Sequence, residues 1–227
     1  MCGILGIIGS NNIPLEVIIG LGKLQHRGPH SAGAHFHIHD GNTAEPLERK
    51  KGVGKVKEVF TREDMEYFKG LENVVVGLGQ VRYITVGSDR DAQPLFIPSK
   101  YGVSMAHNGN LIDYPKHVKR MTLEDNYRRL TKCDVEVLLW LFSKELQGKH
   151  FNSENIFDAI RNIHGPITGV NGAYSVVAAG GIEKQALIAF KDLHGIRPLS
   201  FGIKETDNGL AYALGSENMG YEPMGFE

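Results

Sequence analysis

The chain has 227 residues, and its 25 lysines and arginines nearly balance 26 aspartates and glutamates, which leaves a formal charge of −1. A near-neutral chain offers no electrostatic case for binding nucleic acid or a membrane surface, and its hydrophobic content of 41% is typical of a globular protein. Because no internal repeat or Pro/Ser-rich linker divides the sequence, we expect residues 1–227 to form a single domain.

Cysteine content and hydropathy indicate in which cellular compartment the protein is found. The two cysteines, Cys2 and Cys133, cannot build a disulfide framework, which favours a reducing, cytoplasmic location. No uninterrupted apolar run approaches the roughly 18 residues that a membrane helix needs, and the N-terminus lacks the basic and apolar regions of a signal peptide. We therefore expect neither membrane insertion nor secretion.

The first half of the chain is expected to begin with a buried strand at residue 2. A helix should follow Pro14, and Thr61 with Asp64 resembles the capped start of a second helix. Asp40-Gly41 is typical of a hairpin turn after an alternating strand. The strands expected in this half cover residues 2–9, 34–39, 73–81 and 102–106.

The second half should contain a long helix over residues 134–146 and another that is capped by Ser153. Strands are then expected over residues 172–179, 185–191 and 210–214. Strands thus cluster at both ends of the chain with helices between them. This distribution favours an α+β layered sandwich over alternating βαβ units.

Cys2 is the first candidate for chemistry. Removal of Met1 would place a thiol and a free α-amine on the same residue, and the amine, whose pKa is about 7.7–8.0, can accept the thiol proton near neutral pH. One residue would then supply both nucleophile and base. The alternative is that Cys2 is a small buried hydrophobic residue that happens to be second.

Two further patterns could complete such a site. Asn108-Gly109 follows a strand and can supply an amide and a backbone N–H to a developing oxyanion, although the same dipeptide is typical of a plain hairpin turn. Arg82 leaves the end of a buried strand and can present a planar fork to a carboxylate, unless it is a surface arginine. Asp134 opens a helix and could bind an ammonium group or simply cap the helix.

Several motifs occur in the order found in a known family. The chain resembles the class II glutamine amidotransferases, which are N-terminal-nucleophile hydrolases, in Met1–Ile4, Gln25–Gly28, Gly79–Ser88, Ala92–Pro94, Ala106–Asn110 and Asp134–Glu136. Three later motifs are most similar to the glutaminase domains of amidophosphoribosyltransferases, which act in purine synthesis: Asn171–Tyr174, Asp192–Leu199 and Ser216-Glu217.

This resemblance implies a four-layer αββα sandwich that hydrolyses glutamine to glutamate and ammonia through a cysteine thioester, with no cofactor and no metal. Cys2 would be the nucleophile, and Asn108 and Gly109 the oxyanion hole. Arg82 would hold the α-carboxylate of glutamine and Asp134 its α-ammonium group. Residues Arg27 and Thr85 would line the same pocket.

The chain departs from the family pattern at a few positions and in length. The family usually has His at Gln80, Gln-Asp at Pro29-His30, and Thr or Ser at Cys133, so we expect effects on efficiency or pocket shape. No diphosphate-binding signature precedes Glu227, so the ammonia acceptor is expected on a synthase or phosphoribosyltransferase subunit or domain outside these residues. The alternative function is a non-catalytic glutamine-binding or regulatory subunit.

Three histidines on one predicted strand suggest a second alternative. His35, His37 and His39 alternate and could bind a metal, but ordinary strand alternation explains them equally well.

Overall fold

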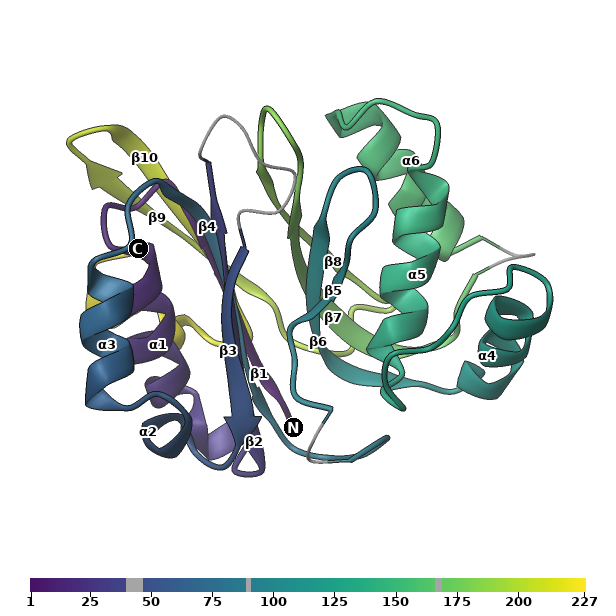
Figure 1. The fold of residues 1–227 in the computed structure, drawn as a ribbon, viewed down its shortest axis with the longest axis horizontal. Helices are drawn as coiled ribbons and strands as arrows, with labels where there is room; N and C mark the ends of the chain where they lie inside the picture. Colours follow the sequence, from purple (N-terminus) through teal and green to yellow (C-terminus); the bar gives the residue numbers. More distant parts are fainter. Residues whose placement is uncertain (40–46, 89–90, 166–168) are drawn as a thin grey trace.

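Two antiparallel sheets lie face to face, and each carries helices on its outer side (Figure 1). The computed structural model describes residues 1–39, 47–88, 91–165 and 169–227. The predicted hairpin signal Asp40-Gly41 lies outside the described residues. The layers follow the order helix, sheet, sheet, helix, which confirms the α+β four-layer sandwich expected from the sequence.

The six-stranded sheet, called sheet A, places the N-terminal strand near its middle. Its order is β3-β2-β4-β1-β10-β9, so β1 pairs with β4 on one side and with β10 on the other. A terminus with a neighbour on both sides cannot fray as ends usually do. The strands of sheet A are β1 (Gly3–Ile8), β2 (Ser31–Ile38), β3 (Leu47–Val53), β4 (Val74–Arg82), β9 (Ser200–Thr206) and β10 (Gly209–Gly215).

The four-stranded sheet, called sheet B, has the order β5-β6-β7-β8. Its first strand is short and pairs only with the beginning of β6, whereas β6 and β7 pair along their whole lengths. The strands of sheet B are β5 (Leu95–Ile97), β6 (Val103–Leu111), β7 (Gly172–Gly180) and β8 (Ala186–Lys191).

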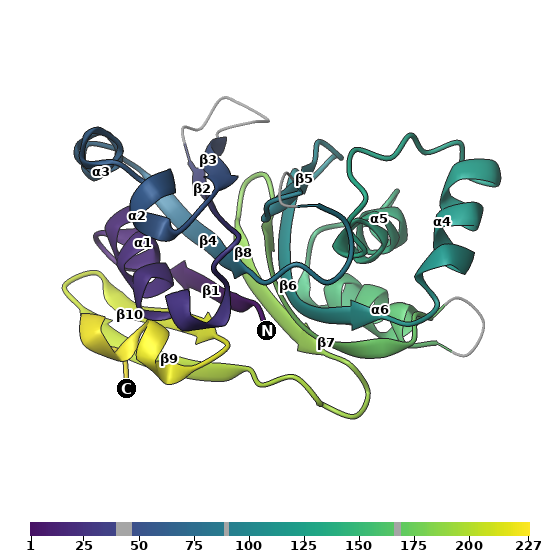
Figure 2. The same cartoon turned by 90° about the horizontal axis from the view of Figure 1, so that it is seen from below.

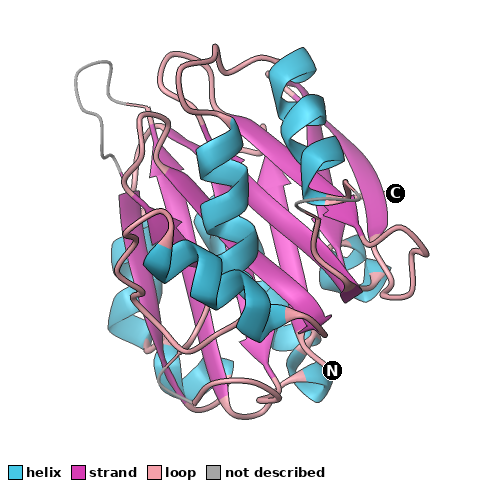
Figure 3. Cartoon of the chain, turned by 90° about the vertical axis from the view of Figure 1, so that its right-hand side faces the viewer, coloured by secondary structure: helices cyan, strands magenta, loops and turns pink. Residues whose placement is uncertain are grey.

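Helices cover the outer faces of both sheets. The layer on sheet A contains α1 (Ile13–Lys23), α2 (Val56–Val59) and α3 (Arg62–Lys69). The layer on sheet B contains α5 (Val135–Glu145) and α6 (Ser153–Ile163), while α4 (Tyr114–Leu123) packs against α5 (Figure 3). The described residues also form short 3-10 helices: η1 (Gln25–Arg27), η2 (Asn218–Gly220) and η3 (Glu222–Met224).

Three apolar cores match these layers. One lies between sheet A and its helices, and a second lies between sheet B and its helices. The third lies between the two sheets, where Ile4, Val76 and Leu78 from sheet A meet Ala106 and Val177 from sheet B. The inter-sheet core explains why β1 and β4 are apolar on both faces. No helix among the described residues is long and apolar enough to cross a membrane.

The structure confirms the expected strand at the N-terminus, the helix after Pro14 and the helix capped by Thr61, and it corrects several boundaries. The strand expected over residues 34–39 is β2, which begins at Ser31 and ends at Ile38. The strand expected to end at Ala106 continues to Leu111, because β7 pairs with β6 along that whole length. The cap of α6 is Asn152 rather than Ser153, since the Asn152 side chain accepts a hydrogen bond from the Asn155 N–H at 2.9 Å.

Candidate active site

Cys2 lies directly before β1, at one end of the interface between the sheets, where the N-terminus is marked in Figures 1 and 2. Its side chain is buried, and its Sγ accepts a hydrogen bond from the Tyr83 N–H at 3.4 Å. Burial raises the pKa of the Cys2 thiol, although the Tyr83 contact and the positive charge of Arg82 act in the opposite direction. Because the net shift is upward, the thiol needs a base to become a nucleophile.

The main chain around Cys2 is fixed from two directions. The buried side chain of Arg27 donates from Nε to the Cys2 carbonyl at 2.9 Å, and its Nη1 pairs with Glu217. Ser216 Oγ accepts a hydrogen bond from the Ile4 N–H at 3.1 Å. These contacts show Arg27 beside the candidate nucleophile, while its predicted contact with glutamine stays a prediction.

The edge of β6 beyond β5 presents main-chain groups to the site. At this edge the His107 N–H donates to Gln93 Oε1 and the Leu111 N–H donates to Asp134 Oδ2, both at 2.9 Å. Because alternate residues of a strand direct their N–H groups to the same side, the N–H of Gly109 faces this edge as well. Gly109 therefore lies between two anchored residues on an edge where the described residues place no neighbouring strand.

Asn108 and Gly109 both have features that an oxyanion hole requires. Asn108 is 1% exposed, and its Nδ2 has no hydrogen-bond partner among the described residues. Gly109 has a φ of +155°, and a Cβ there would lie 2.1 Å from the Ala173 carbonyl oxygen. Only glycine fits that position. A buried amide donor without a partner is costly, and such an exception is typical of functional sites.

Asp134 is buried at the N-terminal end of α5, where its side chain makes no capping hydrogen bond. Its Oδ1 lies 3.3 Å from His107 Nε2, and its Oδ2 accepts from Leu111. Burial pushes the pKa of this carboxyl up, but His107 and the backbone donors outweigh burial, so the pKa is lowered. The structure therefore rules out the simple capping role and leaves a buried negative charge beside the β6 edge.

Arg82 ends β4, and its side chain is buried rather than on the surface. Its guanidinium donates to the carbonyls of Val86 at 2.5 Å, Ser88 at 2.6 Å and Asp91. The segment Tyr83–Ser88 thus wraps around the guanidinium, as the loop expected from the sequence. The predicted fork toward a carboxylate stays a prediction, since these carbonyls already use the same N–H groups.

Thr85 connects this loop to the β6 edge. It is exposed, and its Oγ1 donates to Asn110 Oδ1 at 2.5 Å, one residue beyond Gly109. His30, one of the departures from the family pattern, supports the same loop, because its Nδ1 accepts from the Ile84 N–H at 3.1 Å. Loop and strand edge therefore enclose the region next to Cys2.

Cys133 packs beneath this region. Its Sγ lies 3.2 Å from Gln93 Nε2 and 3.6 Å from Arg82 Nη2. Burial and the neighbouring Asp134 raise the pKa of the Cys133 thiol to about 12. Cys133 is therefore an unreactive packing residue at neutral pH.

Sequence reasoning assigned no role to Gln93, His107 or Glu217. Each stands inside a motif quoted for the family resemblance, so the motif itself was the available signal. Gln93 and His107, which contact each other, are 14 positions apart in the chain, and Glu217 is 190 positions from its partner Arg27. Such contacts become visible only once the strands are paired.

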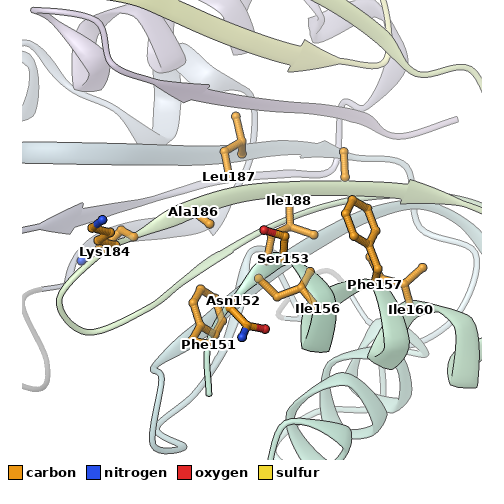
Figure 4. A pocket seen from close by; sticks show the side chains of 12 residues that line it. Phe151, Asn152, Ser153, Ile156, Phe157, Ile160, Lys184, Ala186, Leu187 and Ile188 are labelled. Carbon is orange, nitrogen blue, oxygen red and sulfur yellow. The ribbon is translucent and has the colours of Figure 1, made fainter. Parts of the chain in front are cut away.

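Two other parts of the molecule lie apart from this site. No group of three metal-ligating side chains forms among the described residues, and His35 Nδ1 instead lies 3.0 Å from Ser104 Oγ. A mainly apolar cavity of about 550 Å³ lies between α6 and β8, where Phe157, Ile160 and Ile188 contribute to its lining (Figure 4). None of the predicted site residues lines that cavity.

Comparison with known proteins gives consistent results. Residues 80–219 match the family model described as "Glutamine amidotransferase domain". The amidophosphoribosyltransferases of Pseudomonas aeruginosa and Escherichia coli are each 36% identical to this chain over its whole length. The match covers 43% of the first relative and 44% of the second, so the chain spans less than half the length of these relatives.

Solved structures agree with this result. The match with the glutamine phosphoribosylpyrophosphate amidotransferase of B. subtilis includes 99% of this chain and 44% of the B. subtilis chain. The two are 29% identical in sequence, and the TM-score is 0.75. A structure described as the allosteric regulatory enzyme of purine biosynthesis matches equally well, at 28% identity. The chain belongs to the glutamine amidotransferase domain family and is homologous to the amidophosphoribosyltransferases of purine biosynthesis.

Proposed function

We propose that residues 1–227 form one glutaminase domain in which Cys2 is the N-terminal nucleophile. The observation that carries this proposal is the pairing of two features. The Cys2 thiol is buried at the head of β1, while the β6 edge holds the unpartnered Asn108 amide and the outward N–H of Gly109. A nucleophile and free oxyanion donors are the two requirements of acyl transfer.

Removal of Met1 comes first in the mechanism. Met1 is 55% exposed, which suits its removal by an aminopeptidase. The freed α-amine of Cys2 then takes the proton of its own thiol, which offsets the raised thiol pKa. No histidine is required as a base.

The thiolate attacks the side-chain amide carbon of glutamine, and a C–S bond forms as the carbonyl electrons move onto oxygen. The Asn108 amide and the Gly109 N–H stabilise that oxyanion. As the tetrahedral intermediate collapses, the C–N bond breaks and the nitrogen takes the proton held by the α-amine, so ammonia leaves. Water then attacks the glutamyl thioester, which releases glutamate and restores the thiol.

Arg82 and Asp134 are proposed to hold the amino-acid end of glutamine, and Arg27 and Thr85 to line the pocket. The Asp134 carboxylate, buried and ionised, is a suitable partner for an ammonium group. A glutamine carboxylate at Arg82 would share the guanidinium with the carbonyls of Val86 and Ser88. We therefore expect loop Tyr83–Ser88 to rearrange when glutamine binds.

We further propose that the ammonia serves a phosphoribosyltransferase site outside these residues. The relatives are named amidophosphoribosyltransferases and are more than twice as long as this chain. Cytoplasmic location is proposed on the two unpaired cysteines.

Glutamate release by the purified chain tests the proposed function. The wild-type chain should release glutamate from glutamine, Cys2→Ala should release none above background, and Cys133→Ser should retain activity because its thiol is not a nucleophile. If the wild-type chain binds glutamine but releases no glutamate, the second candidate, a non-catalytic glutamine-binding subunit, is supported instead.

A further inference from the structure

We propose that Gln80 and Gln93 clamp the main chain of His107 and thereby position the Asn108–Gly109 oxyanion hole. This inference rests on the glutaminase function proposed above. It makes Gln80 a positioning residue, since its side chain donates a hydrogen bond to the His107 carbonyl and acts through the peptide that precedes Asn108.

The need for a clamp arises from the shape of sheet B. β5 has only three residues, and its pairing with β6 stops at Leu95↔Met105. His107 is the next residue of β6 whose N–H and C=O face that side, and no strand of the described part of the chain lies there to satisfy them. Buried main-chain groups need partners, so side chains must replace the missing strand.

Two glutamines take that place. Gln93 Oε1 accepts from the His107 N–H at 2.9 Å, and Gln80 Nε2 donates to the His107 carbonyl at 2.6 Å. Gln80 is fully buried, and its Oε1 has no hydrogen-bond partner among the described residues. The bond to His107 is therefore the interaction that justifies a buried polar side chain at this position.

The position of Gln80 connects the two halves of the site. Gln80 belongs to β4 in sheet A and pairs with Ile4, two residues after Cys2, whereas His107 belongs to sheet B and directly precedes Asn108. The Gln80 side chain thus bridges the nucleophile-bearing sheet and the oxyanion-bearing strand. Its loss would leave the peptide between His107 and Asn108 held from the β7 side alone.

A clamp of this kind should act on the transition state more than on substrate binding. The amino-acid end of glutamine is held elsewhere, and Asp134 has its own anchor at Leu111. A displacement of about 1 Å in a catalytic group can cost on the order of 100-fold in rate. Loss of the Gln80 amide should therefore lower kcat and leave KM nearly unchanged.

The experiment compares three variants of the full chain with wild type by glutaminase kinetics and thermal melting. Gln80→Met keeps the length of the side chain without its donor, and Gln80→His restores an N–H donor. Gln185→Met is the matched control, because Gln185 also donates from Nε2 to a main-chain carbonyl, that of Ile38, outside the site.

We expect Gln80→Met to lower kcat roughly 10- to 100-fold with KM within about threefold of wild type. Gln80→His should recover most of kcat, and Gln185→Met should match wild type. Equal kcat in folded Gln80→Met and wild type would overturn the clamp. If Gln80→Met does not fold, the kcat of Gln80→His tests the inference instead. A folded Gln80→His variant with a kcat far below wild type contradicts the inference, and one with a kcat near wild type supports it. A wild-type chain that releases no glutamate from glutamine contradicts the proposed function itself.

Discussion

At the scale of single residues, the site is organised by which hydrogen-bond donors already have partners. Arg82 and Arg27 donate to main-chain carbonyls of the surrounding loops, whereas the Asn108 amide has no partner among the described residues. Donors that are already engaged hold the site in shape, and free donors are available for chemistry. This distinction separates residues whose loss affects binding from those whose loss affects the chemical step.

Asn108→Ala should lower kcat for glutamine hydrolysis by roughly 100- to 1000-fold while KM changes little, because its donor matters most when the oxyanion forms. Steady-state kinetics measures both constants. A large rise in KM with kcat preserved would show that Asn108 binds the substrate instead.

Arg82→Lys should raise KM for glutamine at least about tenfold with a smaller loss of kcat, since a single ammonium cannot replace a planar fork that is shared between a carboxylate and loop carbonyls. The same assay applies, with Arg62→Lys, at an exposed position of α3, as the control. If Arg82→Lys keeps its KM and loses kcat, the roles given to Arg82 and Asn108 are exchanged.

The sequence singled out five candidates by residue type and by the short motifs around them, and their catalytic and binding roles stay predictions: Cys2, Asn108, Gly109, Arg82 and Asp134. It could not show what holds these residues in place. The clamp on His107 and the Arg27–Glu217 pair depend on side chains that meet only after two sheets are assembled.

At the scale of elements, short sequence motifs predicted secondary structure correctly where contacts between near neighbours in the chain determine it. They failed where strand pairing determines it. The capped start of α3 follows from Thr61 and Asp64 alone, and both reciprocal hydrogen bonds are present. By contrast, the Asn-Gly pair at 108–109 indicates a turn locally, but pairing with β7 keeps it extended. Strands β3 and β9 lie on sheet edges and their mixed composition gave no clear signal.

Thr61→Ala should destabilise the chain by about 1 kcal/mol, because α3 loses its capping box. Urea unfolding gives the free energy of unfolding. Thr122→Ala, at an exposed position of α4, should change stability by less than half as much. Equal effects of the two substitutions would mean that the cap contributes nothing beyond helix propensity.

At the scale of the whole molecule, the packing of sheet A determines how stability depends on acid. His35 and His37 of β2 are both buried, and burial lowers the pKa of His37 to about 4 and that of His35 well below its usual value. The folded chain therefore keeps these rings neutral while the unfolded chain protonates them below about pH 6.5. Stability must fall as the pH drops from 6.5 toward 4.

His37→Leu should reduce that acid sensitivity by up to about 3 kcal/mol between pH 6.5 and 4, which corresponds to the lowered pKa of one buried ring. Urea unfolding across this pH range measures the effect, and His39→Gln, an exposed neighbour, should keep the wild-type profile. An unchanged pH slope in His37→Leu would show that the ring is not kept neutral by the fold.

Covalent labelling with a glutamine analogue that carries an electrophilic carbon in place of the side-chain amide tests the identity of the nucleophile most directly. After peptide mapping, the label should be found on Cys2 of chains that have lost Met1, since only that thiol combines the α-amine with the glutamine pocket. Excess glutamine should protect it. A label on Cys133, or equal labelling of chains that retain Met1, would contradict Cys2 as the N-terminal nucleophile.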